Sequence, residues 1–159
     1  ANSAPPVTAF PMPPVKPLGS MGWELGGGRR NHFSDFKGKV LVLDFYATWC
    51  EPCRDSIPHL IELQNRYGNQ GLQVVGLNVG GPDDLEEVPE FAKEFKIQYP
   101  LGVPDDDLST FLLSDDNAIP QTFVFDRKGQ LARKFVGYGG DVASQIDDTI
   151  AAALKSSAE

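Results

Sequence analysis

The sequence predicts an α/β fold built around one mixed β-sheet, and three patterns support this prediction. Apolar runs typical of buried strands alternate with segments whose apolar residues recur at helical spacing. Two strand patterns near the C-terminus flank a tight turn, which predicts an antiparallel hairpin and therefore a sheet of mixed direction. The 159 residues, 41% hydrophobic and 23% charged, correspond to one globular domain of ordinary composition.

Two segments predict strands that are buried on both faces, because they are nearly continuous apolar runs rich in β-preferring residues. They are residues 39–47, KVLVLDFYA, and residues 72–79, LQVVGLNV. Residues 121–126 and 131–138 are the two arms of the C-terminal hairpin. A weaker hairpin is expected over residues 22–36, where short apolar pieces surround three consecutive glycines.

Four segments with helical spacing of their apolar residues fill the gaps: residues 52–67, 85–95, 105–113 and 142–154. Gly68 follows the first of them and is a typical helix terminator. Pro58 lies inside that same helix and is expected to kink it. Pro89 is expected to mark the true start of the second helix, because proline is tolerated in a first helical turn.

The first 21 residues differ in composition from the rest of the chain. They carry six of the 13 prolines and a single charged residue, Lys16. Such a segment favours extended geometry and has no periodic apolar face. We therefore expect a Pro-rich tail or linker over residues 1–21, with a strap on the domain surface as the alternative, and one folded domain over residues 22–159.

The composition argues against several classes of partner. The 14 basic and 22 acidic residues give a net charge of −8, which repels phosphate backbones and makes nucleic-acid binding a poor expectation. No run of apolar residues is long enough to span a membrane, so no such span is expected. Two cysteines are too few for an all-cysteine zinc site or a disulfide-dense scaffold, and no metal is expected.

The two cysteines, Cys50 and Cys53, are separated only by Glu51 and Pro52. Cys50 follows a predicted strand and opens a predicted helix, whose free N–H groups and dipole should lower the pKa of this thiol. Cys53 lies one turn further on, and Pro52 suits a first helical turn. The arrangement favours attack on a disulfide by Cys50 and resolution by Cys53. A structural disulfide, a metal site and two inert thiols are the alternatives.

Asp44 is an isolated carboxyl in the first predicted strand, six residues before Cys50. Burial should raise the pKa of such a carboxyl, so that it is partly protonated near neutral pH. Asp44 could then take a proton from Cys53 while a mixed disulfide is resolved. The alternative is a structural carboxylate satisfied by the backbone or by a lysine.

Residues 38–58, GKVLVLDFYATWCEPCRDSIP, resemble the thioredoxin superfamily, and most of all its TlpA/ResA-like extracytoplasmic thiol-disulfide oxidoreductases. The resemblance extends over roughly residues 21–154. In that family a tryptophan precedes the first cysteine, as Trp49 does here, and a proline follows the second by five residues, as Pro58 does. The buried proton carrier of thioredoxin itself lies six residues before the first cysteine, which is the position of Asp44.

A cis-proline that faces the active site before a strand is a further family feature, and Pro120 in the run IPQTF matches it. The resemblance implies that Trp49 and Ile119 line a substrate groove in which Pro120 leaves the backbone free to pair with an extended peptide. It also implies a thioredoxin-like three-layer fold. This fold has helices on both faces of a central mixed sheet, an N-terminal hairpin extension and a helix–strand insertion over residues 85–113.

The resemblance further implies disulfide exchange with protein substrates and an upstream partner protein that reduces the cysteines again. It implies a location outside the cytoplasm, periplasmic or tethered to a membrane, with cytochrome c maturation as one role. The Pro-rich start of the chain would suit a tether from a membrane anchor. No organic cofactor is expected, and the redox group would be the Cys50–Cys53 disulfide itself.

The sequence differs from the motifs of related families at two positions, and these differences narrow the predicted chemistry of the site. ResA-like proteins can carry a glutamate three residues after the second cysteine, where this chain has Ser56, so the acid–base role is expected to fall on Asp44. Peroxiredoxins carry a threonine three residues before their cysteine, where this chain has Ala47. Thiol peroxidase activity on the same fold and a non-catalytic protein-binding module are the rival functions.

Glu51 and Pro52 are the residues expected to tune the redox potential. A negative charge on Glu51 disfavours a thiolate on Cys50, whereas the helix end favours it, and the two effects are of similar size. Cys50 is therefore expected to be moderately acidic, which predicts a reducing, thioredoxin-like potential.

Overall fold

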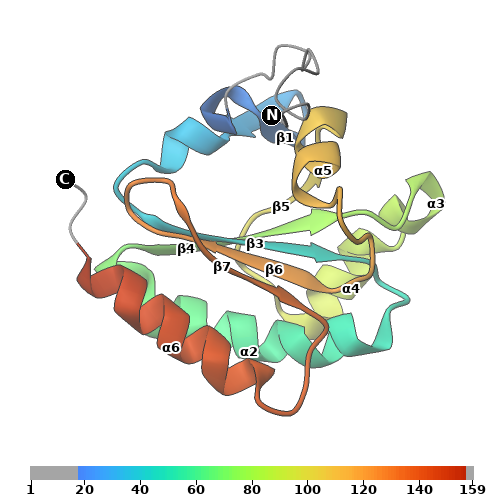
Figure 1. The fold of residues 1–159 in the computed structure, drawn as a ribbon. Coiled ribbons are helices and arrows are strands. Elements are labelled where there is room, and N and C mark those ends of the chain that lie inside the picture. The colour runs from blue at the N-terminus through green and yellow to red at the C-terminus, as the bar shows by residue number, and fades with distance from the viewer. Residues whose placement is uncertain (1–17, 157–159) are drawn as a thin grey trace, which may run out of the picture.

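The computed structural model describes residues 18–156, and a seven-stranded mixed sheet lies at its centre (Figure 1). The strands pair in the order β2-β1-β5-β4-β3-β6-β7. They are β1 (Gly22–Gly26), β2 (Arg29–His32), β3 (Val40–Tyr46), β4 (Leu72–Asn78), β5 (Leu101–Pro104), β6 (Gln121–Phe125) and β7 (Leu131–Val136). The α-helices are α2 (Glu51–Tyr67), α3 (Pro82–Leu85), α4 (Val88–Phe95), α5 (Asp106–Leu112) and α6 (Val142–Lys155). Short 3-10 helices are η1 (Leu18–Ser20), η2 (Phe33–Phe36) and η3 (Gly68–Gln70).

The sheet joins a parallel centre to antiparallel flanks. β4 pairs in parallel with β3 on one side and with β5 on the other, whereas β6 and β7 add antiparallel strands beyond β3. The hairpin of β1 and β2 joins the sheet through β5, where Trp23 pairs with Pro104. The expected α/β fold with a mixed sheet is confirmed. β5 was predictable only from the family resemblance, because four residues are too few to show a period.

Helices cover both faces of the sheet and create the expected three layers. Leu41, Leu43 and Phe45 of β3 pack on one face, together with residues of α5 and η2. Val40 and Val42 pack on the other, together with residues of α2 and α6. Figure 1 shows α2 and α6 below the sheet and α5 above it. All seven residues of β3 are buried, as predicted, and each large apolar side chain buried in this way contributes about 1.5–3 kcal/mol.

The helix predicted over residues 85–95 forms as two helices. α3 ends at Leu85, and α4 begins at Val88 with Pro89 as its second residue. Proline has no N–H with which to continue a helix but is tolerated in a first turn, so it marks a start. The start near Pro89 is therefore confirmed, and the inclusion of Leu85 in the same helix is wrong. The other three predicted helices form as α2, α5 and α6, and Pro58 lies within α2, which continues past it.

The ends of the predicted N-terminal elements need one correction. The hairpin ends at His32, and residues 33–36 form η2 because Phe33 turns into the core, where its ring meets that of Phe125 at 4.6 Å between centroids. The predicted tail lies outside the described residues up to position 17, and Leu18–Ser20 form η1.

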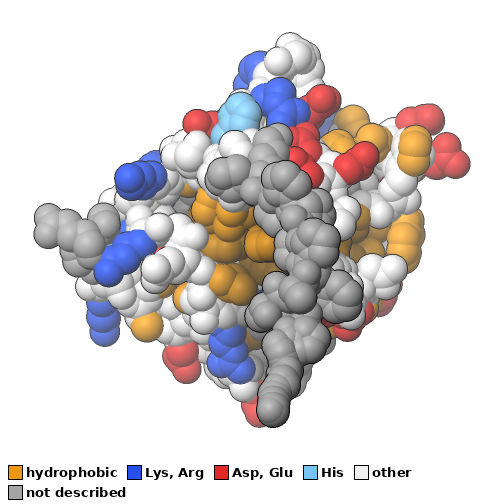
Figure 2. Space-filling view, turned by 45° about the horizontal axis from the view of Figure 1, so that its top comes forward, with side chains coloured by type: hydrophobic (Ala, Val, Ile, Leu, Met, Phe, Trp, Pro, Cys, Tyr) orange, Lys and Arg blue, Asp and Glu red, His pale blue; other side chains and the backbone are white. Residues whose placement is uncertain are grey.

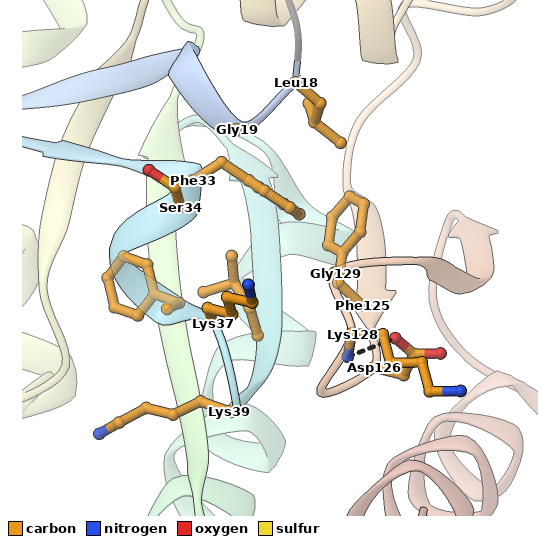
Figure 3. Close-up of a pocket in the computed structure, with 12 residues that line it drawn as sticks. Leu18, Gly19, Phe33, Ser34, Lys37, Lys39, Phe125, Asp126, Lys128 and Gly129 are labelled. Atoms are coloured by element: carbon orange, nitrogen blue, oxygen red, sulfur yellow. Dashed lines mark hydrogen bonds between the residues drawn. The ribbon is translucent and has the colours of Figure 1, made fainter. Parts of the chain in front are cut away.

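A pocket of about 230 Å³ opens beside η1 and η2, on the face of the sheet away from α2. Phe33 and Phe125 lie in its wall, and Lys37, Lys39 and Lys128 stand around it (Figure 3). Figure 2, turned toward this side of the molecule, shows hydrophobic side chains in the middle of the face and basic ones toward its edge. None of the residues lining the pocket belongs to α2 or to the loop of residues 47–49 that precedes it.

Candidate active site

Cys50 lies at the N-terminal end of α2, in the position that caps the helix. β3 ends at Tyr46, and the loop of residues 47–49 leads to Cys50, whose φ of −89° and ψ of 114° are extended rather than helical. Its Sγ accepts a hydrogen bond from the backbone N–H of Cys53 at 3.3 Å. The first N–H groups of a helix lack partners within the helix, so the sulfur satisfies one of them. The cysteine pair therefore opens a helix, as the sequence predicts.

The two cysteines form a disulfide bond and differ in exposure. Cys53 is completely buried, whereas Cys50 keeps 5% of its surface exposed. Trp49, which precedes them, is 66% exposed, more than any other large hydrophobic side chain in the described part of the chain. Cys50 is therefore the more accessible of the two cysteines, and the residue directly before it in the chain presents an exposed aromatic ring. This difference suits the predicted roles of attacking and resolving cysteine.

A segment far along the chain completes the surroundings of Cys50. The Ile119–Pro120 peptide bond is cis, as the family resemblance implies, and Pro120 directly precedes β6. The carbonyl oxygen of Ile119 lies 3.8 Å from the Sγ of Cys50. Gln121 holds the preceding loop by donating from its side-chain amide to the carbonyl of Ala118 at 2.8 Å. The structure thus brings Ile119 and Pro120 together with the cysteines, as expected.

Asp44 is completely buried on the face of β3 that packs against α2. It shares that face with Tyr46, and in the sheet it is paired with Gly76 of β4 and Thr122 of β6. Neither of its carboxylate oxygens has a hydrogen-bond partner among the residues that the structure describes. Burial raises the pKa of Asp44 to about 7.

This environment contradicts the alternative of a structural carboxylate satisfied by the backbone or by a lysine, since the described residues offer Asp44 neither partner. No hydrogen bond joins Asp44 to a cysteine either. The structure shows the disulfide form, in which Cys53 has no proton to donate. A carboxyl that is neutral in part at neutral pH and lies on the α2 side of the sheet can exchange a proton once the cysteines are reduced.

Glu51 and Pro52 occupy the first two positions of α2, and both are exposed. A carboxylate in the first turn is favourable to the helix dipole but unfavourable to a negative charge on the adjacent Cys50. Ser56, at the position where ResA-like proteins can carry a glutamate, is buried and donates its hydroxyl to the carbonyl oxygen of Cys53 at 3.0 Å. Asp44 therefore remains the candidate for acid–base work, as predicted.

The active-site loop makes a further contact that the sequence did not predict. The backbone N–H of Thr48 donates to the carboxylate of Asp84 at 2.9 Å, and Asn78 donates to the same carboxylate at 2.9 Å. In the sequence Asp83 and Asp84 form an acidic pair without any sign that one differs from the other. Only the fold turns Asp84 inward, where it is 5% exposed.

Residues 18–156 contain no group of three or more His, Cys, Asp or Glu side chains arranged to hold a metal ion. His59 of α2 instead lies beside Asp147 of α6, with Nε2 2.7 Å from a carboxylate oxygen. Within the described range, no helix has both the length and the apolar character needed to cross a bilayer.

With a cysteine pair opening the helix that follows its central strand, the molecule is a thioredoxin-fold protein. The chain belongs to the AhpC/TSA family, which matches it over residues 19–134. This confirms the relationship that the motif of residues 38–58 indicates.

Among similar curated proteins are thiol-disulfide oxidoreductases named ResA. The protein from Bacillus subtilis is 32% identical over 110 residues, which cover 69% of this chain and 60% of the relative. That from Geobacillus thermodenitrificans is 31% identical over 112 residues, which cover 69% of this chain and 62% of the relative. The matched region spans less than two thirds of the length of these relatives.

Solved structures show the same fold. A thiol:disulfide interchange protein of the thioredoxin family from Chlorobium tepidum superposes with a TM-score of 0.73 at 26% identity, covering 91% of this chain and 99% of its own.

Proposed function

We propose that this protein is a thiol-disulfide oxidoreductase that reduces disulfide bonds of partner proteins through Cys50 and Cys53. The observation that carries the proposal is the position of Cys50. Its sulfur caps α2 and is bonded to the completely buried Cys53, while Cys50 itself keeps part of its surface exposed next to the exposed Trp49. The names of the similar proteins, thiol-disulfide oxidoreductase and thiol:disulfide interchange protein, support the same class of reaction.

The reaction starts from the reduced protein. The thiolate of Cys50 attacks one sulfur of the substrate disulfide, whose S–S bond breaks, so that a mixed disulfide forms and one substrate thiolate leaves. Cys53 then loses its proton, and its sulfur attacks the Sγ of Cys50, which releases the second substrate thiolate. The products are a reduced substrate and the Cys50–Cys53 disulfide, and two electrons have passed to the substrate.

Asp44 accepts the proton of Cys53 in the second step. Because the pKa of this carboxyl is about 7, a large fraction is ionised at neutral pH and can act as a base. The same pKa allows the carboxyl to return the proton to solvent after each cycle, so neither direction is strongly uphill.

The substrate lies as an extended segment between Trp49 and the backbone at Ile119 and Pro120. The nearby carbonyl of Ile119 marks where such a segment would run past the Sγ of Cys50. Backbone pairing of this kind is largely independent of the side chains of the partner, so the groove would accept a range of protein sequences.

The direction of electron flow follows from two opposing effects on the thiolate of Cys50, that of the helix end and that of Glu51. Glu51 offsets part of the stabilisation that the helix end gives a thiolate, which makes the pair a reductant. Each cycle leaves the pair oxidised, so an upstream partner protein must reduce it again. We place this activity outside the cytoplasm, with cytochrome c maturation as the role to test first. Cys50 and Cys53 are the only redox group in the proposal, which involves no organic cofactor.

Capture of the mixed disulfide tests this function. Cys53→Ser should retain protein substrates covalently on Cys50, and treatment with a thiol reductant should release them for identification by mass spectrometry. Cys50→Ser is the matched control and should retain none. The wild-type protein should reduce the disulfides of insulin, whereas both variants should not. If the wild type fails to reduce insulin and Cys53→Ser retains no protein, the proposal is wrong.

The two rival functions predict different results with the same variants. A thiol peroxidase would consume hydrogen peroxide in Cys53→Ser but not in Cys50→Ser. A binding module would retain its partners in a double variant that lacks both cysteines. Thiol-disulfide exchange requires both cysteines for turnover and loses its partners when both are replaced.

A further inference from the structure

The backbone and side chain of Thr48 are both held by Asp84 of α3. The Thr48 N–H donates to Oδ2 of Asp84 at 2.9 Å, and the Thr48 hydroxyl donates to Oδ1. Asn78, at the end of β4, donates from Nδ2 to Oδ2 of Asp84 at 2.9 Å. A carboxylate that accepts three hydrogen bonds holds its donors more firmly than a neutral acceptor does. The loop that carries Thr48 is therefore tied to the segment between β4 and α4.

The segment before α3 is shaped to let Asp84 reach the loop. A Cβ on Gly80 would lie 2.8 Å from the Cβ of Asp84, closer than real side chains approach, so glycine permits this contact. Oδ1 of Asn78 accepts from the N–H of Gly80 at 2.9 Å, which orients the amide so that its nitrogen faces Asp84. Burial acts to raise the pKa of Asp84, but the hydrogen bonds from Thr48 and Asn78 outweigh it and lower the pKa.

The carbonyl group of Thr48 is held by a residue of α2. Its carbonyl oxygen accepts a hydrogen bond from Nη1 of Arg54 at 3.0 Å. The Arg54 guanidinium donates through Nη2 to Glu94 at 2.8 Å and lies over the ring of Phe95, 4.9 Å from its centre. The N–H, hydroxyl and carbonyl of Thr48 are thus all occupied by partners outside the loop. Cys50 is only two residues further along the chain.

We propose that Asp84 is a positioning residue that, through Thr48, fixes the loop of residues 47–49 and thereby holds the Sγ of Cys50 at the start of α2. There the sulfur accepts the N–H of Cys53, the contact that favours its thiolate. The expected effect of Asp84 on turnover rests on the proposed function. The expected effect of Asp84 on the reactivity of Cys50 does not depend on that function.

A positioning role and a direct electrostatic role of Asp84 predict opposite changes in the stability of the Cys50 thiolate when Asp84 is replaced. If the loop loosens, the sulfur leaves the helix start for part of the time and its thiolate is less favoured. If Asp84 acted only through its negative charge, its removal would favour the thiolate. Replacement of Asp84 therefore moves the reactivity of Cys50 in one direction for a positioning role and in the other for a purely electrostatic one.

The experiment measures the pH profile of iodoacetamide alkylation of Cys50 in the reduced protein, read by mass spectrometry. Asp84→Asn places an amide where only acceptors fit, and Thr48→Val removes the hydroxyl donor but leaves the charge of Asp84. Both variants should shift the midpoint of the profile to higher pH. At a fixed pH below the midpoint, alkylation should be about threefold to tenfold slower. Asp83→Asn, the exposed neighbour on α3, and Thr48→Ser, which keeps the hydroxyl, should follow the wild type.

Thermal unfolding monitored by circular dichroism shows whether each variant folds. Should Asp84→Asn not fold, Thr48→Val and Gly80→Ala, which obstructs the approach of Asp84 without a change of charge, carry the same expectation. An unchanged midpoint in the folded variants, or a shift to lower pH in Asp84→Asn, overturns the proposal. If the midpoint moves as expected while the wild type cannot reduce insulin, the positioning role stands and the proposed function fails.

Discussion

The carbonyl oxygen of Ile119 lies 3.8 Å from the Sγ of Cys50, although 69 residues separate the two in the chain. β6 begins directly after Pro120 and pairs with β3, the strand that leads toward Cys50. The pairing of these strands therefore places peptide backbone next to the reactive sulfur. Trp49 directly precedes Cys50 in the chain and is exposed, so we expect a protein that reaches Cys50 to meet both the backbone and the indole ring.

Trp49→Ala is expected to impair reduction of protein disulfides much more than reduction of a small disulfide reagent. The exposed indole can bury a large apolar area against a protein partner, and tryptophans at such positions often contribute about 2 kcal/mol or more to binding. The ratio kcat/KM should fall by at least about tenfold with insulin and by no more than about twofold with a small aromatic disulfide. Equal losses with both substrates would contradict a role in partner contact.

Asp44→Asn is expected to alter how stability depends on pH. The pKa of Asp44 is about 7 in the folded protein, against an ordinary value of 3.8. Between these values the unfolded chain releases the proton while the folded protein keeps it. Stability contributed by the neutral carboxyl is therefore lost as the pH rises from about 4 to about 7, and the total amounts to roughly 4 kcal/mol.

Urea unfolding of the oxidised protein across that pH range measures this effect. The difference in unfolding free energy between the wild type and Asp44→Asn should grow as the pH rises, with the variant relatively more stable at the alkaline end. Asp148→Asn, an exposed substitution on α6, should run parallel to the wild type. A constant difference between wild type and Asp44→Asn would show that the folded carboxyl titrates in its ordinary range.

The same variant should slow the second chemical step but not the first. Asparagine cannot accept the proton of Cys53, and loss of a general base commonly costs about a hundredfold or more in the step that it serves. Rapid quenching with a labelled disulfide peptide should show the mixed disulfide on Cys50 accumulating in Asp44→Asn. Alkylation of Cys50 should stay within about twofold of the wild type. Equal slowing of both steps would indicate a structural defect.

Glu51→Gln is expected to make Cys50 more reactive and the pair less reducing. An exposed negative charge next to the sulfur disfavours the thiolate, and its removal leaves the effect of the helix end unopposed. Alkylation of Cys50 at mildly acidic pH should be about two- to threefold faster. Equilibration with glutathione should show a higher reduction potential. A potential that does not change, or that falls, would remove Glu51 from the tuning of this site.

Arg127 is expected to contribute to stability and not to redox activity. Its guanidinium donates to the carbonyl oxygens of Gly38 at 3.0 Å, Gln70 at 2.8 Å and Leu154 at 3.0 Å, and so joins three separate parts of the chain. Arg127→Met should cost about 2–4 kcal/mol, because these carbonyls lose charged donors. Urea unfolding measures the loss, and Lys128→Met, on the same turn but exposed, should change stability by less than about 0.5 kcal/mol. Insulin reduction per folded molecule should not change.

Much of the candidate site is predictable because its parts lie close together in the sequence. Asp44, Cys50 and Cys53 belong to one strand–loop–helix unit, so their spacing alone predicts a cysteine at a helix start and a carboxyl buried behind it. Ile119 and Pro120 could be assigned only through the family resemblance. Their contact with Cys50 depends on the antiparallel pairing of β6 with β3, and a local pattern carries no information about which strand will be the neighbour.

The amino-acid sequence by itself determined the long buried strands β3 and β4, the helices α2, α5 and α6, and the cysteine pair, because apolar spacing and helix-start chemistry act over a few residues. The tertiary structure alone decided that Asp84 rather than Asp83 turns inward to hold Thr48, and that the carbonyl of Ile119 stands beside Cys50. The physical reason is that the direction of a polar side chain depends on which groups the folded chain brings within hydrogen-bond distance. Two adjacent aspartates are equivalent until the sheet is assembled.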